Sequence, residues 1–238
     1  MKKKTSFLRI WLSNFGAMIP LNILNGTLLL MLVPYGIAFV GMTRVSIDIA
    51  KRHYYTSITD YFLAISKCWK QALIAGIINL FVTVFLAISV WIYYAASGMV
   101  ATIGLLLSAI ALMIFSFMKY YVWTQIVLID LPLKQIYKNS YFFAFLNFKK
   151  NAIIGTVSLI CYAIAVLTLL YIPYPVLAVM VILLGGCFFP GFKQLLVQWY
   201  VYPFIKKNMI DPYYNERNEN KAEESDRVSD ASEEGVSQ

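Results

Sequence analysis

The stretch QALIAGIINLFVTVFLAISVWIYYAASGMVATIGLLLSAIALMIFSFM, residues 71–118, contains no charged residue in 48 positions. Two further stretches, residues 10–43 and 151–192, are uncharged over 34 and 42 positions. A bilayer core of about 30 Å needs about 20 apolar residues for each helical crossing. Each stretch is therefore too long for one crossing and about right for two, and the sequence predicts a polytopic membrane protein.

The composition supports the same class, because 60% of the residues are hydrophobic and only 13% are charged. Backbone groups in hydrocarbon must bond within their own segment or in a closed barrel, and these runs lack the period-two alternation of barrel strands. We therefore expect an all-α fold, a polytopic transmembrane helical bundle built from helical hairpins.

Glycine and proline place the expected helix ends, since proline removes a backbone donor and glycine permits a turn. Breaks are predicted at Ser97-Gly98 and at Pro173-Tyr174-Pro175, and the sequence Pro34-Tyr35-Gly36 divides the first run as well. The prediction is six membrane helices, with five as the alternative if the first run crosses only once. The expected ranges are 10–32, 35–52, 71–95, 99–122, 151–172 and 176–205.

Lysine and arginine predict the orientation. Four precede the first apolar run, five lie between residues 44 and 70, five between 119 and 150, and none in either short hairpin. By the positive-inside rule these basic loops face the cytoplasm, where they would meet the anionic lipids of the inner leaflet. Six crossings place both termini inside a plasma membrane, whereas five would put Lys2, Lys3 and Lys4 outside.

The charge divides the chain into two predicted regions. Residues 1–210 carry 17 Lys and Arg against three acids, a net charge of +14, and form the expected transmembrane domain. Residues 211–238 carry nine acids against three basic residues, a net charge of −6, with few apolar residues to bury. We expect this second region to be a disordered, acidic, cytoplasmic tail.

Residues 61–80 align without gaps on residues 141–160 with six identities, which predicts a parallel internal repeat and favours six crossings. The aromatic segments 58–69 and 136–148 overlap the starts of these two copies. Their apolar residues at helical spacing and nearby lysines predict helices that lie flat on the inner membrane surface. Docking sites for a partner protein are the alternative.

Five polar residues are the candidate intramembrane contacts. Asn22, Asn25 and Asn79 lie inside predicted crossings, where an amide needs a hydrogen-bond partner. They either join helices or line a polar cavity for a solute, which Gln125 could share. Arg44 and Asp48 lie four residues apart and can pair on one helix face, as can Asp48 and Arg52. A structural pair in the inner headgroup zone and a gating or solute contact are the two readings.

Catalytic, cofactor-binding and metal-ligating residues are not predicted. Only Asp48, Asp60 and Asp130 are acidic in the first 210 residues, and the single histidine, His53, has no second ligand nearby. The cysteines, Cys68, Cys161 and Cys187, lack metal or redox spacing. Phosphate loops, dinucleotide fingerprints and nucleophile elbows are absent from the sequence. We expect a protein that is not an enzyme and does not bind nucleic acid.

Short motifs along residues 5–205 resemble the YesL-like family of bacterial integral membrane proteins. They are Leu24-Asn25, Pro34, Gly-Met-Thr-Arg at 41–44, Asp-Tyr-Phe at 60–62 and Trp-Lys-Gln-Ala at 69–72. The usual Thr and Gly after the proline are replaced by Ile37 and Phe39. The resemblance implies a plasma-membrane protein of Gram-positive-type bacteria that occurs alongside carbohydrate-uptake transporters and sensors, without catalytic residues.

Two hypotheses follow from the sequence. The first is a non-enzymatic accessory or regulatory protein of carbohydrate uptake, with a transporter or sensor subunit as partner. The alternative is a small solute transporter or channel, while a lipid enzyme would require the three acids to meet in one cleft. Convergence of Asn22, Asn25, Asn79 and Arg44 on one cavity would favour transport, and their dispersal onto helix contacts would favour the accessory role.

Overall fold

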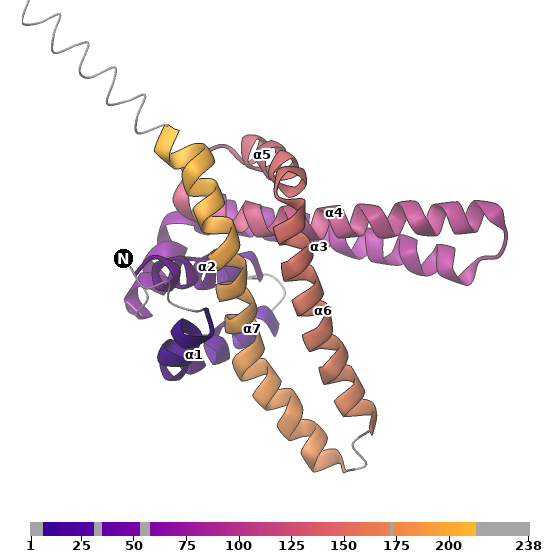
Figure 1. Cartoon of the computed structure of the whole chain (residues 1–238), viewed down its shortest axis with the longest axis horizontal. Coiled ribbons are helices and arrows are strands. Elements are labelled where there is room, and N and C mark those ends of the chain that lie inside the picture. Colours follow the sequence, from indigo (N-terminus) through magenta and orange to yellow (C-terminus); the bar gives the residue numbers. More distant parts are fainter. Residues whose placement is uncertain (1–6, 31–34, 53–57, 172–173, 213–238) are drawn as a thin grey trace, which may run out of the picture. The chain divides into compact units, whose positions relative to one another are not determined.

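The computed structural model describes residues 7–30, 35–52, 58–171 and 174–212. This part of the chain is helical throughout apart from short turns, as Figure 1 shows, and the all-α expectation is confirmed. The helices are α1 Phe7–Leu30, α2 Tyr35–Arg52, α3 Ile58–Ala95, α4 Met99–Leu128, α5 Leu133–Leu146, α6 Phe148–Tyr171 and α7 Pro175–Ile205, followed by a π-helical turn at Lys206–Ile210.

The chain divides into two compact units, residues 1–201 and residues 202–238. In the second unit, the described residues are the end of α7 and the π-helical turn, where Asn208 Nδ2 donates a hydrogen bond of 2.7 Å to the carbonyl oxygen of Phe204. The tail expected from residue 211 lies almost wholly outside the described residues. Its disorder stays a prediction.

Four helices in the described part of the chain are long and apolar enough to cross a membrane. These segments are Phe7–Thr27, Ile58–Ala95, Met99–Leu128 and Phe148–Thr168. They indicate a membrane-embedded protein. The more polar helix α2 is not among them, and many side chains of α7 lie outside the described set, so the number of six crossings stays a prediction.

Helices α3 and α4 form a hairpin and lie side by side (Figure 1). The predicted break at Ser97-Gly98 is confirmed: Gly98 has φ 104°, a backbone conformation that favours glycine. Along the hairpin, large apolar side chains such as Phe85, Trp91 and Leu107 are exposed. Such a surface suits lipid, because hydrocarbon solvates it without cost.

The segment 58–69 is not a separate surface helix. It is continuous with residues 71–95 in the 38-residue helix α3. Lysine and glutamine favour helix, so the basic residues Lys67 and Lys70 mark a change of polarity without ending the helix. Tyr61, Ala64 and Ala72 are buried along one stripe that runs through both parts. Residues 58–69 therefore continue in the direction of residues 71–95, and they cannot lie flat on the membrane surface if residues 71–95 cross the membrane.

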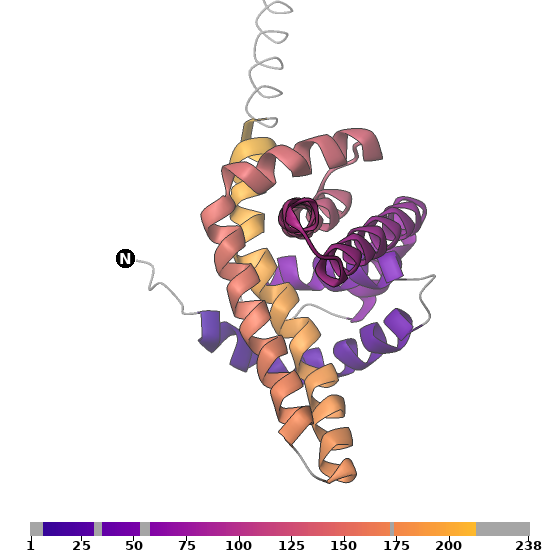
Figure 2. The ribbon, with the colours of Figure 1, turned by 90° about the vertical axis from the view of Figure 1, so that its right-hand side faces the viewer.

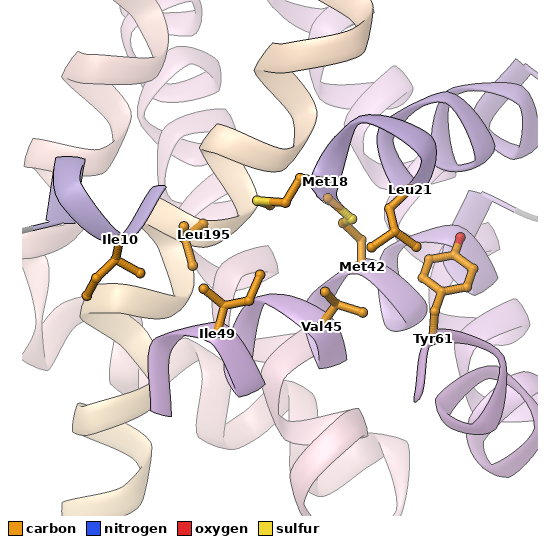
Figure 3. Packing of buried hydrophobic residues seen from close by; sticks show 8 residues of the cluster. All are labelled: Ile10, Met18, Leu21, Met42, Val45, Ile49, Tyr61 and Leu195. Atoms are coloured by element: carbon orange, nitrogen blue, oxygen red, sulfur yellow. The ribbon is translucent and has the colours of Figure 1, made fainter. Parts of the chain in front are cut away.

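Among the side chains that the structure describes in the first unit, those of α2 are the most completely buried, and this helix contacts α1, α3 and α4. Figure 3 shows part of its packing, in which Met42, Val45 and Ile49 meet side chains of α1, α3 and α7. Its approach to α3 is close at Gly36 and Gly76, where a Cβ on either glycine would collide with the backbone of the opposite helix. Close backbone packing at small residues is typical of membrane helices.

Helix α5 is separate from α6, as expected for residues 136–148. The chain turns at Asn147, and Figure 2 shows α5 leading into α6 at a marked angle. Ile136, Ser140 and Ala144 form the buried face of α5. Opposite, Phe142 and Leu146 are exposed. The two copies of the proposed repeat therefore differ in structure, since α3 runs unbroken through the equivalent position.

Candidate functional site

Asn22 and Asn25, the two candidate residues of α1, lie on the side of that helix that faces α7. Asn22 is 3% exposed, and its amide packs so closely against Gly191 that a Cβ there would collide with it. Asn25 is also 3% exposed, but its Oδ1 has no hydrogen-bond partner. Asn22 thus takes part in the contact between α1 and α7, whereas Asn25, one turn further along α1, has a buried acceptor oxygen without a hydrogen bond.

Asn79 lies elsewhere, between α3 and α5. Its Oδ1 accepts a hydrogen bond of 3.1 Å from the hydroxyl of Tyr137, which also lies 3.3 Å from the carbonyl oxygen of Ala75. Burial raises the pKa of Tyr137 above its ordinary value of 10.0, so the phenol remains a hydrogen-bond donor at neutral pH. Asn79 therefore joins α5 to α3.

Arg44 and Asp48 form an ion pair within α2, with Arg44 Nε 2.9 Å from Asp48 Oδ2. The Asp48 side chain is 4% exposed and that of Arg44 is 36% exposed. The acid is thus buried beneath a partly accessible guanidinium. The third member of the predicted stack, Arg52, has its side chain outside the described residues.

Further polar pairs join helices that are distant in sequence. Thr124 and Gln198 link α4 to α7. The Thr124 hydroxyl oxygen lies 3.1 Å from Gln198 Oε1 and 3.0 Å from Gln198 Nε2. The amide of Gln194 donates to the hydroxyl of Thr43, which links α7 to α2. Sequence reasoning missed these pairs, because an isolated Gln or Thr in an apolar run shows that a partner is needed but not where it lies.

The same arrangement recurs where α4 meets the α5–α6 region. Tyr121 donates a hydrogen bond of 2.9 Å to Asn151 Oδ1, and the Asn151 amide donates to the carbonyl oxygen of Ala144 at 3.0 Å. Gln125, considered above as a member of a solute cavity, donates to Ser140 Oγ at 2.8 Å instead. These contacts hold α4, α5 and α6 together.

One small cavity lies among α1, α2, α6 and α7, with a volume of about 120 Å³. Asn25 is the only one of the five candidate residues among its lining side chains. The other polar lining residues are Tyr162, Lys193 and Gln194, and the remaining four are apolar. Lys193 Nζ donates to the Tyr162 hydroxyl at 3.3 Å. Asn22, Asn79, Arg44 and Asp48 lie at other contacts.

A larger open cleft of about 600 Å³ lies along residues 67–71 of α3 and residues 126–130 at and just beyond the end of α4. At its edge, Cys68 Sγ lies 3.4 Å from the carbonyl oxygen of Ile126, and Gln71 Nε2 donates to that of Leu131 at 3.1 Å. Carbonyls at the end of a helix lack partners within it, so the Cys68 contact satisfies a carbonyl at the end of α4. The Gln71 bond instead ties α3 to the segment between α4 and α5.

The described residues show no group of three or more His, Cys, Asp or Glu side chains that could hold a metal ion. Cys68 and Cys161 are free thiols in this part of the chain. His53 and the side chain of Cys187 lie outside it.

Comparisons of the chain with protein-family models, with curated proteins and with solved structures found no match.

Proposed function

We propose that this chain is a non-enzymatic accessory or regulatory protein of the cell membrane that associates with a carbohydrate-uptake transporter or its sensor. The dispersal of the candidate polar residues supports the proposal. Asn79 and the Arg44–Asp48 pair occupy separate contacts, and Asn22 packs against Gly191. Transport would favour their convergence on one pathway, whereas dispersed contacts suit a protein whose helices hold a fixed surface for a partner.

The resemblance to the YesL-like family supplies the carbohydrate-uptake part of the proposal. The exposed face of α5 supplies a surface that a membrane partner could cover. Tyr141, Phe142 and Phe145 are 47%, 53% and 47% exposed on this helix, with Lys138 beside them. Aromatic residues are enriched in the energetically important parts of protein interfaces.

Co-purification with site-specific crosslinking tests the proposal. A photo-crosslinking residue at Phe142, in cells that express the full chain, should capture a membrane subunit of a carbohydrate transporter or sensor. The matched control places the same residue at Leu107, which is 63% exposed on the apolar hairpin and should capture lipid. Extraction in mild detergent that never enriches such a subunit, with only lipid adducts at both positions, would contradict the accessory role.

A small solute transporter is the second candidate, and the cavity at Asn25 is the observation in its favour. Its volume of about 120 Å³ is smaller than the about 300–1,000 Å³ of ordinary small-molecule sites, so it suits only a small solute. Flux of sugars or ions in proteoliposomes that is lost in Asn25→Leu would favour this candidate, and absence of flux would exclude it for the solutes tested.

A further inference from the structure

The cavity of about 120 Å³ combines features that protein packing alone does not explain. Its lining carries one ammonium group, Lys193, and no acidic residue. The ammonium nitrogen lies 5.3 Å from the centre of the Tyr162 ring and 3.3 Å from its hydroxyl oxygen. Since that oxygen accepts from lysine, the phenol proton remains available as a donor. The site therefore offers a positive charge and a hydroxyl donor to an anion.

The unpartnered oxygen of Asn25 is an independent observation about the same cavity. Asn25 is 3% exposed, and a buried acceptor without a donor is destabilising because it has given up its hydrogen bonds to water. A ligand that carries a hydroxyl group would supply the missing donor. A ligand that satisfies all of these polar groups would therefore carry an oxyanion and, close to it, a free hydroxyl group.

The surroundings of Tyr162 point to the source of such a ligand, because this lining residue also belongs to the exposed face of α6. Tyr162 is 48% exposed, and Leu159 and Val166, one turn away on either side, are 69% and 54% exposed. An acyl chain can lie along this apolar surface while its headgroup reaches Lys193.

We propose that the cavity lined by Asn25, Tyr162 and Lys193 binds the headgroup of an anionic phospholipid that carries a free hydroxyl, as phosphatidylglycerol does. The phosphate contacts Lys193 and the Tyr162 hydroxyl, and the headgroup hydroxyl donates to Asn25 Oδ1. This proposal rests on membrane embedding and not on any partner, so it stands or falls separately from the accessory role.

Native mass spectrometry of the purified full chain with added lipids tests the site. Three probes separate charge from hydroxyl: phosphatidylglycerol, phosphatidylmethanol with the same charge and no hydroxyl, and zwitterionic phosphatidylcholine. We expect retention to fall in that order. Lys193→Gln should weaken phosphatidylglycerol binding about tenfold or more, since it removes a charged hydrogen bond. Lys193→Arg should retain binding.

Lys70→Gln is the matched control, because it removes an exposed lysine of α3 and should change the affinity by less than about twofold. Asn25→Leu should bind phosphatidylglycerol and phosphatidylmethanol alike, a ratio that carries the test even if Lys193→Gln fails to fold. Equal binding of all three lipids, or unchanged selectivity in Asn25→Leu, would overturn the proposal. So would free glycerol phosphate that binds as tightly as the lipid, because the ligand would then be soluble.

Discussion

Gly36 and Gly76 are the residues at which α2 and α3 have the least space between them. A Cβ at Gly36 would collide with the carbonyl oxygen of Ala72, which is backbone and cannot move aside alone. Both residues lie within helices, so glycine is here for the space and not for a turn. Side-chain volume at these two positions sets the distance between the helices.

Gly36→Ala should lower the free energy of unfolding by about 1–3 kcal/mol, because the added methyl group forces the two backbones apart. Thermal unfolding in detergent measures the change. Gly16→Ala is the control: apart from the adjoining residues and backbone of its own helix, no atom lies within 4 Å of the added Cβ, and alanine favours helix by about 1 kcal/mol over glycine. If both variants are equally stable, the close approach is absent.

The contribution of the Arg44–Asp48 ion pair can be tested with a single substitution. Asp48→Ala removes the partner of Arg44, whose side chain is 36% exposed and can still reach water. We expect a loss of about 1–2 kcal/mol, less than the 3–5 kcal/mol for a pair buried on both sides. Asp130→Ala, at an exposed position, should have no measurable effect. A similar loss in both variants would mean that the pair does not contribute to stability.

At the scale of elements, α5 depends on hydrogen bonds to its neighbours. Tyr137 donates to Asn79 of α3, and Ser140 accepts from Gln125 of α4. Both bonds come from the buried face of a short helix, and α5 therefore has a fixed orientation against the hairpin. The aromatic residues on its opposite face are exposed for the same reason.

A double-mutant cycle on Tyr137→Phe and Asn79→Leu should give a coupling energy of about 1 kcal/mol, the net value of one buried hydrogen bond. The readout is the unfolding midpoint of the four proteins under one condition. Tyr141→Phe serves as the control partner, since Tyr141 is 47% exposed and should show no coupling to Asn79. Additive effects of Tyr137→Phe and Asn79→Leu would exclude the contact.

Helix ends were predictable where a glycine or a proline interrupts the helical backbone. Gly98 adopts φ 104°, and α2 begins at Tyr35 and α7 at Pro175 close to the expected prolines. The unbroken helix α3 was not predictable from the change of polarity at Lys67 and Lys70, because charge marks the edge of a membrane and not the end of a helix.

Partners across the fold were less predictable than helix ends. Gln194 and Thr43 are 151 residues apart. Helical periodicity shows which face of a helix is apolar, but the pairing of two faces depends on packing between whole helices. Asn79 was therefore identified as an amide that needs a partner, whereas Tyr137 as that partner required the structure.

At the scale of the whole molecule, the central claim is that the basic loops lie on the inner side of the membrane and the two short hairpins on the outer side. The four helices able to cross a membrane support embedding, while the side of each loop is predicted from Lys and Arg. The face that α5 offers to a partner depends on this orientation.

Labelling of single-cysteine variants in intact cells with an impermeant maleimide tests this claim most directly, after Cys68, Cys161 and Cys187 are replaced by serine. Ser97→Cys, in the exposed turn of the α3–α4 hairpin, should react from outside. Lys138→Cys on α5 and Thr5→Cys should react only after the membrane is permeabilised, and Thr5→Cys distinguishes six crossings from five. Labelling of Lys138→Cys from outside, with Ser97→Cys protected, would contradict the account.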